Sequence, residues 1–185
     1  MRDSFDAAGW HRHARQVPSP NYNVRPPGTE VDLIVIHAIS LPPGEFGKGY
    51  VECFFRNELP VAVHPYFREI QELQVSAHFL IDRRGRLTQF VSTEARAWHA
   101  GQSLWEERSN CNDFSIGIEL EGTESDPFTR AQYLRCARLC RQLQQRYPAI
   151  TDARIVGHQD VAPGRKWDPG PQFRWELFRS LLTHA

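Results

Sequence analysis

The chain has 185 residues, and its 22 lysines and arginines balance its 22 aspartates and glutamates. The length fits one domain with a core of its own, and zero net charge gives no field favouring nucleic acid or an anionic membrane as partner. The start, MRDSFDAAGWHRHARQ, has no apolar signal segment, and no run approaches the ~18 apolar residues of a membrane helix. The four cysteines form no CxxC pair and are expected to be reduced thiols. We expect a single domain over residues 1–185, and a monomeric, cytoplasmic protein.

In the first half of the chain, one run stands out as a buried strand. VDLIVIH (31–37) is apolar on both faces, which predicts a central strand. An extended, Pro-rich lead-in is expected before it, within residues 1–30. The elements expected after it are a loop (38–49), a short helix (50–59) and a hairpin of two strands (76–82 and 86–91).

In the second half, residues 114–122 alternate between two faces. One face carries Phe114, Ile116, Ile118 and Leu120, and the other carries Ser115, Gly117 and Glu119. The other elements expected are a loop (99–113), a helix (130–147) opened by a Thr129–Gln132 capping box, a strand (153–158) and a closing amphipathic helix (173–184). Strands that alternate with helices predict an α/β fold with a mixed sheet covered by helices.

Three side chains could form a metal site. His37 and His158 each end a predicted strand, and Asp168 follows in GHQDVAPGRKWDPGP (157–171), where Pro163 and Gly164 stop a helix and allow the chain to double back. Two imidazoles and a carboxylate, with one position left for water, are the composition of a catalytic zinc site. A histidine at a strand end is more often structural, so spacing alone leaves both interpretations open.

Two further residues fit hydrolysis beside such a metal. Glu119 follows only Ser and Gly on its face of the strand, which leaves room for a water that it could deprotonate. Lys166 could stabilise an oxyanion. The alternatives are a solvent-facing glutamate on an edge strand, as expected of Glu121, and a solvated loop lysine.

The remaining histidines are weaker candidates. We expect His78 to support the site from behind, His99 to line a pocket, and His64 to form a loop wall with Tyr66. The histidines near the termini, His11, His13 and His184, are expected to be solvated.

Together these residues fall in five segments, VIHAISLPPGEFG, HPYF, VSAHFLI, AWHAG with CNDFSIGIELEGT, and GHQDVAPGRKWDPGP. In this combination the chain resembles the zinc-dependent N-acetylmuramoyl-L-alanine amidases of the AmpD type, cytosolic enzymes that act on 1,6-anhydro-muropeptides in cell-wall recycling. The resemblance covers nearly the whole chain.

The resemblance implies a central mixed sheet flanked by helices and one Zn²⁺ per chain. The zinc ligands would be His37, His158 and Asp168. Glu119 would activate the water that attacks the lactyl–L-alanine amide, and Lys166 would stabilise the tetrahedral intermediate. The positions expected to contact the muropeptide are Ala38, Tyr66 and His99.

Some positions depart from the family pattern. Close relatives usually carry Asn where this chain has Ala38, and some carry Arg where it has Gln74 and Asn110. Trp167 stands where a smaller residue is usual. We expect these differences to alter substrate affinity and stem-peptide preference, with Arg108 as a possible replacement for the cation missing near Asn110.

Two other functions are open. One is a muropeptide-binding protein of the same fold that has lost catalysis, and the other is an amidase acting on polymeric peptidoglycan. The intact set of inferred ligands favours an enzyme, and the missing signal segment and wall-binding module favour a soluble muropeptide as substrate. The long loop 38–49 and residues 60–74 could cover the site.

Overall fold

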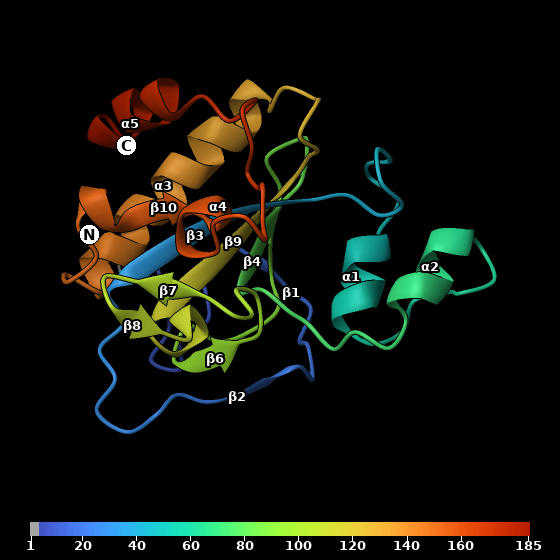
Figure 1. The fold of residues 1–185 in the computed structure, drawn as a ribbon. Helices are drawn as coiled ribbons and strands as arrows, with labels where there is room; N and C mark the ends of the chain where they lie inside the picture. The colour runs from blue at the N-terminus through green and yellow to red at the C-terminus, as the bar shows by residue number, and fades with distance from the viewer. Residues whose placement is uncertain (1–3) are drawn as a thin grey trace.

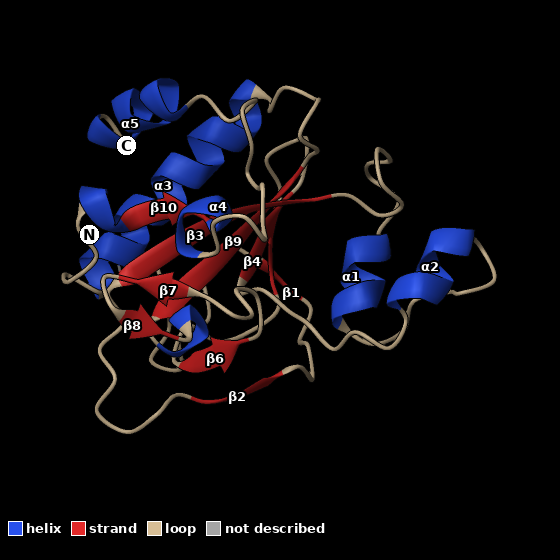
Figure 2. Cartoon of the chain, in the orientation of Figure 1, coloured by secondary structure: helices blue, strands red, loops and turns tan. Residues whose placement is uncertain are grey.

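The apolar run expected to form a central strand does so in the computed structural model, which describes residues 4–185 (Figure 1, Figure 2). The strands are β1 (Arg15–Gln16), β2 (Tyr22–Val24), β3 (Leu33–Ile39), β4 (Phe79–Ile81), β5 (Leu87–Gln89), β6 (Ala95–Ala97), β7 (Leu104–Trp105), β8 (Arg108–Ser109), β9 (Ser115–Glu121) and β10 (Ile155–Gly157). The helices are α1 (Tyr50–Phe55), α2 (Pro65–Ile70), α3 (Arg130–Arg146), α4 (His158–Val161) and α5 (Trp175–Thr183), with 3-10 turns η1 (Cys111–Asp113) and η2 (Asp152–Arg154).

The main sheet has the strand order β1-β5-β4-β9-β3-β10. Strands β4, β9, β3 and β10 run parallel, β4 and β5 form the predicted antiparallel hairpin, and β1 pairs with β5 in parallel. The predicted mixed sheet flanked by helices is therefore confirmed. The parallel set matters for function, because the carboxyl ends of its strands share one edge.

One face of the sheet is covered by α3 and α5, which lie side by side in Figure 1. Alternate residues of β3 and β9, such as Ile36 and Ile118, pack against the buried side of α3 in the largest apolar cluster. Helix α3 begins with the predicted capping box, in which Thr129 and Gln132 satisfy each other's backbone N–H groups. The apolar core between this face of the sheet and the two helices stabilises the fold.

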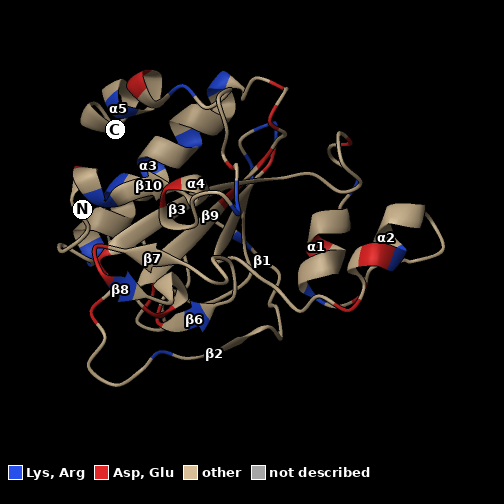
Figure 3. Ribbon diagram, in the orientation of Figure 1, with Lys and Arg blue, Asp and Glu red and all other residues tan. Residues whose placement is uncertain are grey.

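The other side of the molecule is more irregular. Helices α1 and α2 stand apart from α3 and α5 (Figure 1) and enclose a second apolar cluster that includes Phe54 and Phe67. A third, small cluster lies around Leu33, Val35 and Cys111. Acidic and basic residues are interspersed along the ribbon (Figure 3). No helix within residues 4–185 is long and apolar enough to cross a membrane.

Several local predictions were wrong. The loop wall expected at His64 and Tyr66 is the start of helix α2, and the loop expected at 99–113 contains the β7–β8 hairpin and η1. The helix predicted for 50–59 ends at Phe55, because Asn57 adopts a left-handed conformation. The lead-in is not a simple extended tail, since β1 joins the main sheet and β2 pairs with β6.

Three side-chain predictions also need correction. Phe114 does not share the α3 face with Ile116, because it caps η1 before the strand becomes extended and packs in the third cluster instead. His11 is buried, with its ring bonded to Gln142 and stacked edge-on to Phe5. Glu121 is buried in a central strand, where its carboxylate accepts the backbone N–H groups of Gly47 and Arg83.

Candidate active site

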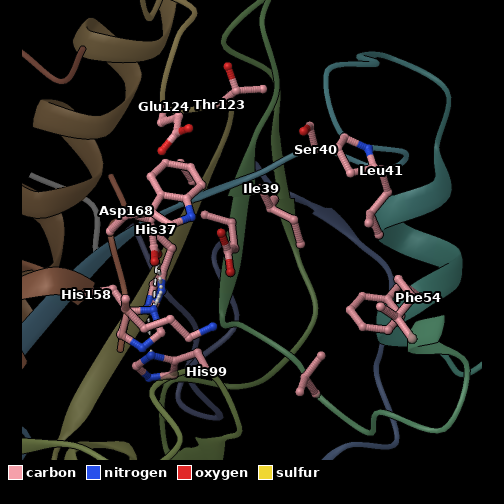
Figure 4. Close-up of a pocket in the computed structure, with 18 of the residues that line it drawn as sticks. His37, Ile39, Ser40, Leu41, Phe54, His99, Thr123, Glu124, His158 and Asp168 are labelled. Atoms are coloured by element: carbon pink, nitrogen blue, oxygen red, sulfur yellow. Dashed lines mark hydrogen bonds and ion pairs between the residues drawn. The ribbon is translucent and has the colours of Figure 1, made fainter. Parts of the chain in front are cut away.

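Three buried side chains meet at the carboxyl edge of the parallel strands. His37 lies near the end of β3, His158 is the first residue of α4 directly after β10, and Asp168 follows ten residues later. His37 Nδ1 lies 2.9 Å from His158 Nδ1, and each of these nitrogens lies 3.1 Å from Asp168 Oδ2. The three residues predicted as ligands are thus brought together, as Figure 4 shows.

The local sequence explains this convergence. Strands β3 and β10 are parallel neighbours, so they deliver His37 and His158 to the same edge. His158 begins a helix rather than ending a strand, and Asp160 caps that helix by accepting the N–H of Gly157. The helix ends before Pro163, and the chain returns so that Gln159 N–H donates to the Asp168 carbonyl. The expected doubling back is therefore observed.

The donor atoms suit a divalent cation. His158 donates Nε2–H to the carbonyl of Ala100, which can only accept, so its Nδ1 lone pair faces Asp168. Burial, with repulsion from His158, lowers the pKa of His37 to about 4. Asp168 Oδ2 lies 3.1 Å from both Nδ1 atoms, so three metal-ligating atoms face one another. Neutral imidazoles and an ionised carboxylate at contact distance are a donor set that zinc accepts.

Glu119 lies beside this group on β9, opposite His37 in the strand register. It is buried in a central strand, not solvent-facing, and its Oε2 has no hydrogen-bond partner among residues 4–185. Burial raises its pKa well above the ordinary value, the negative charge of Asp168 raises it further, and Lys166 opposes the shift. A carboxylate whose pKa is raised is a stronger base than an ordinary glutamate, which suits it to take a proton and return it.

All of these residues line a cavity of about 870 Å³. Ala38, Tyr66 and His99 line it as well, as does Lys166, which is exposed at its rim. Figure 4 shows the metal-site side chains on one side of the cavity and Leu41 and Phe54 on the other. The cavity therefore has a polar wall that carries the candidate metal site and an apolar wall opposite it.

A family comparison decides what this site belongs to. The sequence profile of one family, described as N-acetylmuramoyl-L-alanine amidase, matches residues 27–171. The chain belongs to this amidase family. Its type within the family is AmpD, because it is 52% identical to the 1,6-anhydro-N-acetylmuramyl-L-alanine amidase AmpD of Haemophilus influenzae over 91% of each chain.

Solved structures agree with this assignment. A crystal structure of a selenomethionine derivative of AmpD has a TM-score of 0.93 and 49% identity, and it covers 96% of this chain and 98% of that one. A complex of the amidase AmiD from E. coli with its substrate anhydro-N-acetylmuramic acid-L-Ala-D-gamma-Glu-L-Lys is 28% identical with a TM-score of 0.58. It covers 98% of this chain and 66% of that one.

Sequence reasoning missed part of the amidase cavity. The loop Gly122–Asp126 lines it, because this loop follows β9 at the edge that also carries His37. The parallel pairing of β3 and β9 would have indicated that this loop lies beside His37. Arg108 does not replace a cation in the cavity, since it is bound to Asp32 and stacks over Phe114.

Proposed function

We propose that this amidase hydrolyses the amide bond between the lactyl group of (1,6-anhydro-)N-acetylmuramic acid and L-alanine, with one Zn²⁺ held by His37, His158 and Asp168. The observation that supports it best is the buried donor triad beside a glutamate of raised pKa, all lining one cavity. Zinc held there would supply Lewis-acid activation of the amide carbonyl and would acidify a water molecule.

The chain's own residues account for the proton transfers. Glu119 accepts the proton of the attacking water as the water oxygen bonds to the amide carbon. It then returns the proton to the L-alanine nitrogen as the carbon–nitrogen bond breaks. Lys166, at the cavity rim, places a positive charge where the carbonyl oxygen becomes negative.

The substrate and setting are part of the proposal. The AmiD complex shows that a relative takes an anhydro-muramyl peptide as substrate. We therefore propose a soluble anhydro-muropeptide in the cytoplasm as the substrate of this chain, with Ala38, Tyr66 and His99 on the cavity wall around it.

The experiment is turnover of an anhydro-muramyl tripeptide, followed by mass spectrometry on the protein as purified, after chelation, and after zinc is restored. We expect anhydro-N-acetylmuramic acid and free tripeptide, lost on chelation and regained with zinc. Zinc bound at one per chain without cleavage would instead support the binding-protein function, and Ala38→Asn would then be the variant to test. Faster turnover on intact sacculi than on the soluble substrate would support an amidase of polymeric peptidoglycan.

A further inference from the structure

The segment from Trp98 to Ser115 lies behind both candidate metal histidines. His37 Nε2 is 2.9 Å from His99 Nδ1, and His158 Nε2 is 3.0 Å from the carbonyl oxygen of Ala100. The backbone N–H groups of His99 and Ala100 both donate to Asn112 Oδ1, at 3.0 and 2.7 Å. Asn112 Oδ1 therefore fixes the two residues that contact the Nε2 atoms of His37 and His158.

The direction of each hydrogen bond follows from a backbone carbonyl. The Ser115 hydroxyl donates to the carbonyl of Cys111, which can only accept, and so its single proton is committed there. Ser115 Oγ, 3.2 Å from His99 Nε2, can then only accept a hydrogen from that nitrogen. With its proton on Nε2, a neutral His99 presents a lone pair at Nδ1.

The same logic continues to His37. Because His99 Nδ1 accepts, His37 must donate its Nε2–H, and its Nδ1 is left without a proton. That bare nitrogen is the atom that lies 2.9 Å from His158 Nδ1 and 3.1 Å from Asp168 Oδ2. The chain of bonds thus ends with a lone pair facing the other two donor atoms.

The His99 ring lies against strand β9 at Gly117, which has no side chain. A Cβ atom added at Gly117 would lie 2.4 Å from His99 Cγ, so a side chain there would displace the ring. The His78 ring packs against it at 5.8 Å between centroids, and His78 Nδ1 accepts the N–H of Gly117. Glycine at this position lets the imidazole lie against the sheet within reach of Ser115.

We propose that Ser115 and His99 are positioning residues that fix the tautomer of His37, so that its Nδ1 is ready to bind the metal. This inference rests on the proposed metal site and changes the expected role of His99. His99 lines the cavity, but both of its ring nitrogens are engaged by protein atoms. It acts through His37 rather than by hydrogen-bonding the muropeptide.

Two neighbouring serines provide a matched test. Ser115 bonds to the carbonyl of Cys111, whereas Ser103 Oγ accepts the N–H of Cys111 and donates to Gly101. Both are buried, and of the two Ser115 is the one that hydrogen-bonds to His99. We would compare Ser115→Ala with Ser103→Ala, with His99→Phe as a second break in the chain and Ser115→Thr as the variant that keeps the hydroxyl.

Two measurements are made on the full chain. The first is zinc affinity, by competition with a chromophoric chelator. The second is the protonation of the ring nitrogens of His37 in the zinc-free protein at pH 7.5, by two-bond ¹H–¹⁵N NMR. We expect Ser115→Ala and His99→Phe to weaken zinc binding by about 10- to 100-fold and to give His37 a mixture of tautomers. Ser103→Ala and Ser115→Thr should keep zinc affinity within about threefold and the single Nε2–H tautomer.

The opposite results would overturn the proposal. They are wild-type zinc affinity with an unchanged His37 tautomer in Ser115→Ala, or a raised KM with unchanged zinc affinity in His99→Phe, which would make His99 a substrate contact. If Ser115→Ala does not fold, His99→Phe carries the test alone. A wild type that binds zinc tightly but cleaves no muropeptide would refute the amidase proposal and leave this one standing.

Discussion

The two faces of strands β3 and β9 differ in what they bury. On the α3 face, Ile36 and Ile118 enter an apolar cluster whose members gain free energy by leaving water. On the opposite face, His37 and Glu119 are also buried but are polar. Burying such groups costs free energy unless they are paired, and within the described part of the chain Glu119 Oε2 has no hydrogen-bond partner. The α3 face therefore stabilises the fold, whereas the opposite face carries the candidate catalytic groups at a cost in stability.

The largest expected effect is that of Glu119→Gln on catalysis at the polar face. The amide cannot take a proton from water, so we expect kcat to fall by about 10²- to 10⁴-fold with zinc still bound. Stability should stay within about 1 kcal/mol, because the replaced oxygen has no partner to lose. Muropeptide turnover, zinc content and urea unfolding measure these three quantities. Full turnover by the zinc-loaded variant would show that Glu119 is not the base.

Ile118→Ala tests the adjacent residue, which points to the opposite face. Its side chain is fully buried, and its truncation should lower the free energy of unfolding by about 2–5 kcal/mol. The matched control is Leu134→Ala, a half-exposed position on α3 expected to cost about 0.5 kcal/mol or less. Urea unfolding gives both values. A cost at Ile118 no larger than at Leu134 would contradict the role assigned to this face.

Acid should destabilise the polar face through His78. Burial, together with the charge of Arg25, lowers the pKa of His78 from 6.5 to about 3. A lowered histidine pKa means that the unfolded chain binds the proton first, so stability is complete above pH 6.5 and is lost as pH falls toward 3. The contribution is about 1.4 kcal/mol per pH unit for one group.

The measurement is urea unfolding between pH 7 and 4.5 for wild type and His78→Gln. The variant should lose less stability per pH unit than wild type. The control variant is His13→Gln, at an exposed histidine. Equal slopes in wild type and His78→Gln would mean that His78 does not stay neutral in the folded state.

The smallest expected effect belongs to the capping box that begins α3 on the apolar side. Thr129→Ala removes the acceptor for the Gln132 N–H and should cost about 1 kcal/mol of unfolding free energy. Thr151→Ala is the control, because Thr151 also precedes a helical turn but makes no side-chain cap bond. The midpoint of thermal unfolding should be lower for Thr129→Ala than for Thr151→Ala. The reverse order would show that the capping box does not stabilise the protein.

Periodicity predicted the regular elements and failed where the backbone leaves regular structure. The strand at 31–37 and the capped helix at 130–147 follow from apolar spacing and cap residues, and both were found. Phe114 was assigned to the wrong face because strict alternation was extended into a 3-10 turn. Helix α2 is only six residues long, too short for its apolar spacing to indicate a helix.

The sequence also determined much of the candidate site, since His37, His158, Asp168, Glu119 and Lys166 were all singled out before their positions were known. The order of neighbouring strands was decided only in the tertiary structure, because pairing depends on packing between distant segments. That order puts Glu121 in a central strand and buries it, where sequence pattern suggested an exposed edge. It also places His99 behind His37, 62 residues away in the chain, where spacing gives no information about which ring nitrogen carries the proton.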